Sequence, residues 1–227
     1  MTARQVLDRL RSVAESRAAT RWRRLGLDAA HCLGVSMARL RRVARSLPKD
    51  HDLARGLWDL GFHESRLLAA MLEVPAAVSD EQLDRWVSGA DHCDLSDLVT
   101  RRVARRSLFA RTKVADWREH PRELVRRSAY VLLGDLAETD SAMTDADFIP
   151  HVNVVSTAIH LEAPLVREAM IRALVRIGRR NDVLRHRALH ALERIGAVGV
   201  VGVGEPEVAL GPRARRRGVR GARSDAA

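Results

Sequence analysis

The stretch Leu124 to Leu133, LVRRSAYVLL, is matched by the stretch Leu165 to Leu174, LVREAMIRAL, which begins 41 residues later. In both stretches the apolar residues recur at intervals of three and four, which places them on one side of an α-helix. The first stripe consists of Val125, Ala129, Leu132 and Leu136, and the second of Val166, Ala169, Met170, Ala173, Leu174 and Ile177. Both stretches are therefore predicted to be helices with one buried face.

The spacing of the two stretches indicates a repeat. An offset of 41 residues lies within the period of about 40 to 47 residues expected for two-helix HEAT-type repeats. Such repeats stack on their neighbours and curve to form a concave surface. We predict an α-solenoid of HEAT-like helix pairs, and the polar positions expected on its exposed side are Arg126, Arg127, Tyr130, Arg172, Arg176 and Arg179.

Composition supports an all-α fold, because aromatic residues make up only 4% of the chain while Ala, Leu and Arg are abundant. No linker rich in Pro, Gly or Ser divides residues 1–195, which we treat as one domain. The predicted helices are Ala3 to Ala18, Ala38 to Ser46, Asp50 to Leu60, His63 to Leu72, Asp80 to Val87, Leu95 to Arg105, Ala110 to Arg118, Arg122 to Ala137, Asp145 to Ile159, Pro164 to Arg179 and Asp182 to Ile195.

The charge of the chain suggests a polyanionic partner. The net charge is +10, and nearly all of the positive charge is arginine, with lysine only at positions 49 and 113. A strongly positive field favours binding to nucleic acid ahead of acidic lipid surfaces. The alternative is that these arginines form solvated faces and partly reflect coding bias.

Several classes of protein do not fit the sequence. The chain has no secretory pattern at its start, and its longest weakly polar run, Ile195 to Gly204, is too short and glycine-rich to span a bilayer. G-x-S-x-G, Walker, G-x-G-x-x-G and H-E-x-x-H motifs are also absent, so no nucleotide cofactor is indicated. We expect a cytoplasmic protein, with reduced cysteines and no membrane partner.

The segment Asp91 to Thr100, DHCDLSDLVT, has the residue types of a metal site. The pairs His31-Cys32 and His92-Cys93 could together supply four zinc ligands, but adjacent residues diverge and the usual two-to-four-residue ligand spacing is absent. We predict no metal site. Both cysteines are more readily explained as small buried apolar residues.

The same segment can also begin a helix. Asp94 fits an N-cap residue, and Asp97 three positions later fits the acidic partner of a capping box. Asp97 also precedes Arg101 by one helical turn, which predicts an exposed ion pair.

Residues 196–227 lose the helical periodicity and end in an arginine-rich run, so we predict a basic, disordered C-terminal tail. The tail could be dispensable, or it could add phosphate contacts.

Several strings, taken in order, resemble the AlkD-type DNA alkylation repair family of HEAT-repeat DNA glycosylases. The similarity runs from about Arg21 to Ile195 and is most distinctive in the LGVS, GFHESRLLA and IGRRN strings. The matching strings are HCLGVSMARLRRVARSL, LWDLGFHESRLLAAML, EQLDRWV, DHCDLSD, ELVRRSAYVLLGDLA and VREAMIRALVRIGRRN.

The resemblance implies a monomer that binds duplex DNA on its concave face, associated with the nucleoid if the protein is bacterial. It implies hydrolysis of the N-glycosidic bond of N3-alkyladenine or N7-alkylguanine without base flipping, metals or organic cofactors. By the same resemblance, Asp97 matches the catalytic carboxylate and Arg127 a supporting arginine. Implied DNA contacts are Arg126, Arg172, Arg176, Arg179 and Arg180.

The chain departs from the family pattern at two tryptophan positions, which Cys93 and Arg172 occupy. The family's tryptophans pack against the lesion and favour a cation through their ring faces, whereas an arginine repels one. The alternative prediction is therefore a HEAT-repeat module that has lost catalysis and binds DNA or a protein. Trp22, Trp58, Trp86 and Trp117 match neither position and are predicted to fill interfaces between helices.

Overall fold

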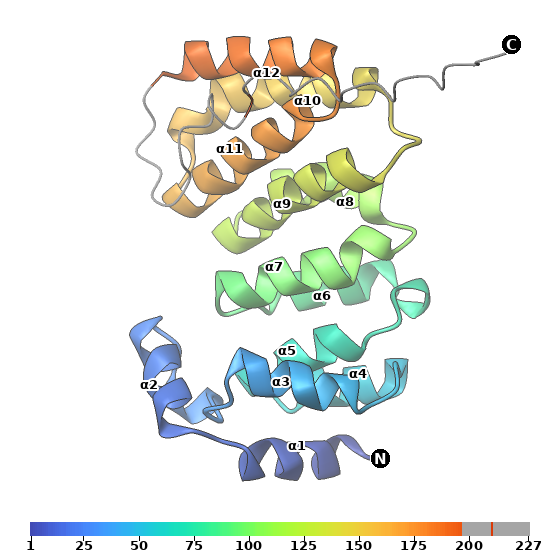
Figure 1. Cartoon of the computed structure of the whole chain (residues 1–227), viewed down its shortest axis with the longest axis vertical. Helices are drawn as coiled ribbons and strands as arrows, with labels where there is room; N and C mark the ends of the chain where they lie inside the picture. The colour runs from blue at the N-terminus through green and yellow to red at the C-terminus, as the bar shows by residue number, and fades with distance from the viewer. Residues whose placement is uncertain (197–209, 211–227) are drawn as a thin grey trace, which may run out of the picture.

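The computed structural model describes residues 1–196 and Leu210 (Figure 1). All regular structure in this part of the chain is helical. The α-helices are α1 (Ala3–Ser12), α2 (Ser16–Arg24), α3 (Met37–Arg45), α4 (His51–Asp59), α5 (His63–Leu72), α6 (Asp80–Ser88), α7 (Cys93–Arg102), α8 (Ala110–Arg118), α9 (Glu123–Thr139), α10 (Asp145–Ala158), α11 (Pro164–Gly178) and α12 (Asp182–Ile195). The short 3-10 helices are η1 (Ala29–His31), η2 (Pro75–Ala77), η3 (Ala104–Arg106) and η4 (Ile159–Leu161).

The helices stack as antiparallel pairs. Within the pairs α4–α5, α6–α7, α8–α9 and α10–α11 the two helices contact each other. The second helices also pack in series, α5 on α7, α7 on α9 and α9 on α11, and α12 packs on both α10 and α11. In Figure 1, α7 and α9 lie in front of α6 and α8. We call α5, α7, α9 and α11 the inner layer. The predicted α-solenoid of HEAT-like helix pairs is confirmed.

Local sequence signals explain many of the helix ends. The side chains of Asp50, Ser79 and Asn181 each accept a hydrogen bond from the backbone N–H three residues later, which satisfies a donor that has no partner inside the helix. Pro164 begins α11, where its missing N–H costs nothing. The predicted helix bounds agree with the structure to within a few residues from α3 onward.

The N-terminus differs from its prediction. The single helix expected over Ala3 to Ala18 is two helices, α1 and α2, and the sequence analysis missed most of α2. At the break, the backbone N–H of Glu15 donates to the carbonyl of Gly34 at 2.6 Å instead of continuing the helix. This hydrogen bond joins segments far apart in the chain, so local periodicity could not indicate it.

Burial of α9 corrects a second expectation. Arg127 and Tyr130 were predicted to be exposed, but they are 5% and 3% exposed. The stripe argument fails because α9 packs on α7, α8 and α11 and is therefore covered on several sides. Gly134 permits the approach of α11, since a Cβ there would lie 3.1 Å from Cδ of Arg176 and 3.3 Å from Cα of Ala173.

The four tryptophans fill helix interfaces, as predicted, and all are buried. The rings of Trp58 and Trp86 stack with their centroids 4.5 Å apart and join α4 to α6. Trp117 donates from Nε1 to Asp84 at 2.7 Å and joins α8 to α6.

In the described part of the chain, no helix is both long enough and apolar enough to cross a membrane. The predicted tail, residues 196–227, lies outside the described residues except for Gly196 and Leu210. Leu210 is buried and packs over Gly178 of α11.

Candidate functional site

The segment DHCDLSDLVT, residues 91–100, contains the start and most of α7. We call the exposed side of the inner layer the inner face. The helix begins at Cys93, and the N-cap residue is His92, whose Nδ1 accepts a hydrogen bond from the backbone N–H of Asp94 at 3.1 Å. The prediction that Asp94 caps the helix is therefore wrong. Asp94 lies in the first turn, where its carboxylate still interacts favourably with the helix dipole.

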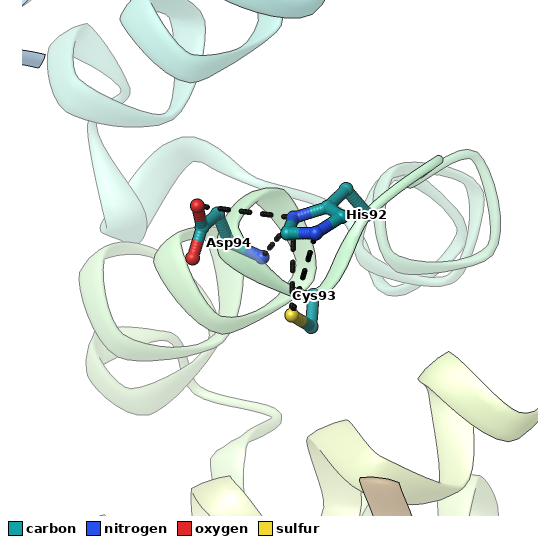
Figure 2. Close-up of side chains that lie close together, drawn as sticks. All are labelled: His92, Cys93 and Asp94. Carbon is teal, nitrogen blue, oxygen red and sulfur yellow. Dashed lines mark hydrogen bonds and ion pairs between the residues drawn. The ribbon is translucent and has the colours of Figure 1, made fainter. Parts of the chain in front are cut away.

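His92, Cys93 and Asp94 form a compact group of potential metal ligands (Figure 2), with one donor atom from each lying within 4.8 Å of the others. The lone pair of His92 Nδ1, however, already accepts the Asp94 N–H. Sγ of Cys93 lies 3.8 Å from Nδ1 and 3.9 Å from Nε2 of His92, so it is aligned with neither nitrogen lone pair. This geometry fits a helix cap better than a metal site.

Asp97, one turn further along α7, is held by α9. Both of its carboxylate oxygens accept hydrogen bonds from Arg127, from Nε at 2.9 Å and from Nη2 at 2.9 Å. This two-point contact fixes the plane of the carboxylate as well as its position. The predicted partner of Asp97 was Arg101, and that expectation is wrong, because Asp97 pairs with Arg127 of α9 instead.

Arg127 also joins α9 to α11. Its Nη1 donates to Glu168 at 2.7 Å and to the carbonyl of Leu165 at 2.8 Å. Glu168 in turn pairs with Arg172 at 2.7 Å. Asp97, Arg127, Glu168 and Arg172 form what we call the ion network, which crosses three inner-layer helices and has no net formal charge.

Exposure is graded along the ion network. The side chain of Arg127 is 6% exposed, those of Asp97 and Glu168 are 20% and 18% exposed, and that of Arg172 is 47% exposed. Burial alone would lower the pKa of Arg127, but its hydrogen bonds and ion pairs with Asp97 and Glu168 outweigh burial and raise the pKa. Arg127 is thus a permanent cation that orders two carboxylates at the protein surface.

Asp97 retains the chemistry required of a catalytic carboxylate. A carboxylate offers about four lone-pair positions, and Arg127 uses two of them. The exposed part of Asp97 could therefore orient a water molecule or stabilise a nearby positive charge.

The arginines predicted to bind DNA already contact protein groups. Arg126 pairs with Glu162 at 3.1 Å, and Arg172 pairs with Glu168. Arg176 pairs with Asp135 and with Glu138, while Arg180 donates to the carbonyls of Ala137 and Met143. Arg179 is exposed at the end of α11. Their role in DNA binding stays a prediction.

Glu168 is a site residue that the sequence analysis missed. It lies 41 residues after Arg127, which is the same offset as that between the matching stretches, so the two residues occupy equivalent positions of successive repeats. Equivalent positions of stacked repeats face each other. Opposite charges at one repeat position were the signal that could have revealed this pair.

Cys93 lies among these charges, at one of the two positions where the family resemblance implies tryptophan. Burial raises the pKa of the Cys93 thiol; Arg127 opposes the rise, and Asp94, Asp97 and Glu168 add to it. Cys93 is therefore less of a nucleophile at neutral pH than an ordinary cysteine.

We expect iodoacetamide to modify Cys93 slowly at pH 7.5 in the Cys32→Ser variant, where it is the sole thiol. The rate should rise at a higher pH than for an ordinary exposed cysteine, because burial raises the pKa of the Cys93 thiol and only the thiolate reacts. Mass spectrometry of timed samples measures this profile. Cys93→Ser is the matched control and reports Cys32, whose pKa is raised by burial to about 11. A Cys93 profile equal to that of an unperturbed cysteine in a short peptide would contradict the interpretation.

Comparisons with known proteins agree with the fold. One solved structure is described as belonging to "a new family of proteins related to the HEAT-like repeat DNA glycosylases with affinity for branched DNA structures". Its TM-score with this protein is 0.80, at 22% sequence identity over 88% of this chain and 86% of that chain, which shows a shared fold. No curated protein matches the chain. The family model described as DNA alkylation repair enzyme matches residues 6–197. This match spans the inner layer and the ion network, and the chain therefore belongs to the DNA alkylation repair enzyme family.

Proposed function

We propose that the protein binds double-stranded DNA as a monomer along its inner layer and removes alkylated purines, with Asp97 as the catalytic carboxylate. The observation that supports this role is the two-point contact with Arg127, which fixes a partly exposed carboxylate on the inner face. Substrates of this class are N3-alkyladenine and N7-alkylguanine.

The proposed reaction needs few catalytic groups from the protein. An alkylated purine is already cationic and leaves as a neutral base, so positive charge moves to the deoxyribose as the N-glycosidic bond breaks. Asp97 would stabilise that charge and orient a water molecule, whose oxygen bonds to C1′ and whose proton passes to solvent. Removing one group that stabilises the transition state in this way lowers the rate by a factor of about 100 to 1,000.

The test is base release from duplex DNA that contains N7-methylguanine. We expect the wild-type protein to release the base above the spontaneous rate, and Asp97→Asn to lose about 100-fold or more of that rate. Asp94→Asn is the matched control, because Asp94 is an exposed carboxylate in the first turn of the same helix. Equal rates for wild type and Asp97→Asn would remove Asp97 from catalysis.

The second candidate is DNA binding without excision. The ion network favours it, because Arg172 pairs with Glu168 and leaves the face without the net negative charge that would stabilise a cation. The solved relative described by its affinity for branched DNA makes a four-way junction the natural second probe. Binding of junction and duplex with no base release would favour this candidate.

Substitutions at Cys93 and Arg172, the two positions where the chain lacks the family's tryptophans, separate the two candidate functions further. If Cys93→Trp/Arg172→Trp gains base release that the wild type lacks, the wild-type site is a catalytic site that has lost its aromatic contacts. If the double variant gains nothing while DNA binding persists, the inner face serves binding alone.

A further inference from the structure

One edge of the inner layer gathers cations that have no acidic partner. We call it the basic rim and define it as Lys49, Arg101, Arg102, Arg105 and Arg106. Arg101 and Arg102 lie in the last turn of α7, Arg105 and Arg106 lie in η3, and Lys49 belongs to the connection between α3 and α4. None of the five forms an ion pair with any carboxylate of residues 1–196.

The rim is a single surface in space. The amine of Lys49 donates to the carbonyl of Met71 at the end of α5. The next connection after α5 contains η2, against which η3 packs. Lys49 therefore lies on the same side of the inner layer as η3 and the end of α7. Burial, followed by the charges of Arg102 and Arg106, lowers the pKa of Lys49, because like charges at this distance repel one another.

Nearby carboxylates are already engaged. Glu138 lies close enough to Arg101 for their charges to interact, but it is paired with Arg176 at 2.7 Å. Glu73 acts on Lys49, yet its oxygens accept hydrogen bonds from His51 and Gln82. The rim thus lacks compensation within the described fold. Helix dipoles explain only part of it, because they act within the last turn, whereas η3 and Lys49 lie beyond α7.

The rim adjoins the ion network. Arg101 follows Asp97 by four residues, so it occupies the same side of α7 about 6 Å further along the helix axis. Arg101, Arg102, Arg106 and Lys49 are all exposed. The arginines selected from sequence on α9 and α11 are mostly tied to carboxylates or carbonyls, whereas those of the rim are available for a ligand.

We propose that the basic rim is the edge of the inner face that binds the phosphate backbone of DNA. Duplex DNA presents one negative charge per about 1.7 Å of its axis, so neighbouring cations of the rim can each meet a different phosphate. Their binding would relieve the repulsion among the rim cations and release counterions. The proposal rests on the proposed DNA binding and names the residues that would supply its phosphate contacts.

The experiment is a fluorescence-anisotropy titration of a labelled duplex at several salt concentrations. We expect Arg101→Gln/Arg102→Gln/Arg106→Gln to weaken binding on the order of tenfold or more at low salt. The slope of log affinity against log salt should become shallower by about 2 to 3, since each lost phosphate contact removes about 0.9. The matched control, Arg55→Gln/Arg85→Gln/Arg187→Gln, loses the same charge from exposed positions of α4, α6 and α12, and it should change the slope by less than about 1.

The outcomes are distinguishable. If the wild type binds and the rim variant keeps the wild-type slope, the rim inference fails while the proposed function stands. If both triple variants lose affinity equally, net charge alone matters and the rim inference also fails. If the wild type binds neither duplex nor four-way junction at low salt, the proposed function fails and the rim inference fails with it.

Discussion

Replacing Arg127 with methionine is expected to lower the free energy of unfolding by about 3 kcal/mol or more. Arg127 is 5% exposed, and its guanidinium makes two hydrogen bonds to Asp97, one to Glu168 and one to the Leu165 carbonyl. Its removal leaves the part-buried carboxylate of Asp97 without a cation and leaves Glu168 with Arg172 as its one remaining partner. Breaking a buried ion pair from one side costs about 3 to 5 kcal/mol, because the remaining charge is desolvated and unpaired.

Thermal unfolding monitored by circular dichroism measures this effect, and we expect the Tm to fall by about 10 °C. The control is the same substitution in an Asp97→Asn/Glu168→Gln background. There Arg127 is a buried cation without anionic partners, so Arg127→Met should cost little or even stabilise the protein. An equal loss in both backgrounds would show that packing, rather than the ion network, explains the role of Arg127.

Replacing Glu64 with alanine is expected to lower the free energy of unfolding by a similar amount, about 4 kcal/mol, although Glu64 is not part of the ion network. The Glu64 side chain is fully buried in the first turn of α5. Its carboxylate accepts the backbone N–H groups of Leu33 at 2.8 Å, Gly34 at 2.7 Å and Val35 at 3.0 Å. Each buried donor left without a partner costs about 1 to 3 kcal/mol.

The connection held by Glu64 has a demanding geometry. Gly34 has a φ of +82°, and a Cβ at that position would lie 3.1 Å from both Cβ of Ala19 and the carbonyl oxygen of Glu15. Glu64 therefore fixes the loop that also breaks α1 from α2. Urea denaturation of Glu64→Ala and of Glu193→Ala, an exposed carboxylate on α12, tests this role. We expect the free energy of unfolding of the control to stay within about 0.5 kcal/mol of wild type. A change equally small for Glu64→Ala would contradict the role of Glu64 in holding this loop.

The fold could be predicted because each helix pair repeats a local pattern. Apolar stripes at three- and four-residue spacing, Pro164 at the start of α11 and capping side chains such as Asn181 are all short-range signals. The 41-residue offset between Leu124 and Leu165 then indicated how the helices stack. The candidate residues Asp97 and Arg127 came from the family resemblance, and their contact with each other is a finding of the structure.

Two predictions failed where a contact between segments far apart in the chain replaced a local one, and a third failed at a helix start. Asp97 pairs with Arg127 on the next inner helix rather than with Arg101, and Glu15 donates to Gly34 rather than continuing α1. His92 caps α7 in place of Asp94. Spacing along the chain could not indicate the first two contacts, and it allowed either His92 or Asp94 to cap α7.

The sequence by itself determined that this chain folds as stacked helix pairs, because helical periodicity and repeat length are properties of neighbouring residues. Only the tertiary structure decided which charges are compensated. It pairs Asp97 and Glu168 with Arg127, and it pairs the predicted DNA-binding residues Arg126, Arg172 and Arg176 with carboxylates. It leaves the cations at the end of α7 without acidic partners among residues 1–196. The physical reason is that electrostatic energy depends on distance and burial in space, which the order of residues along the chain does not specify.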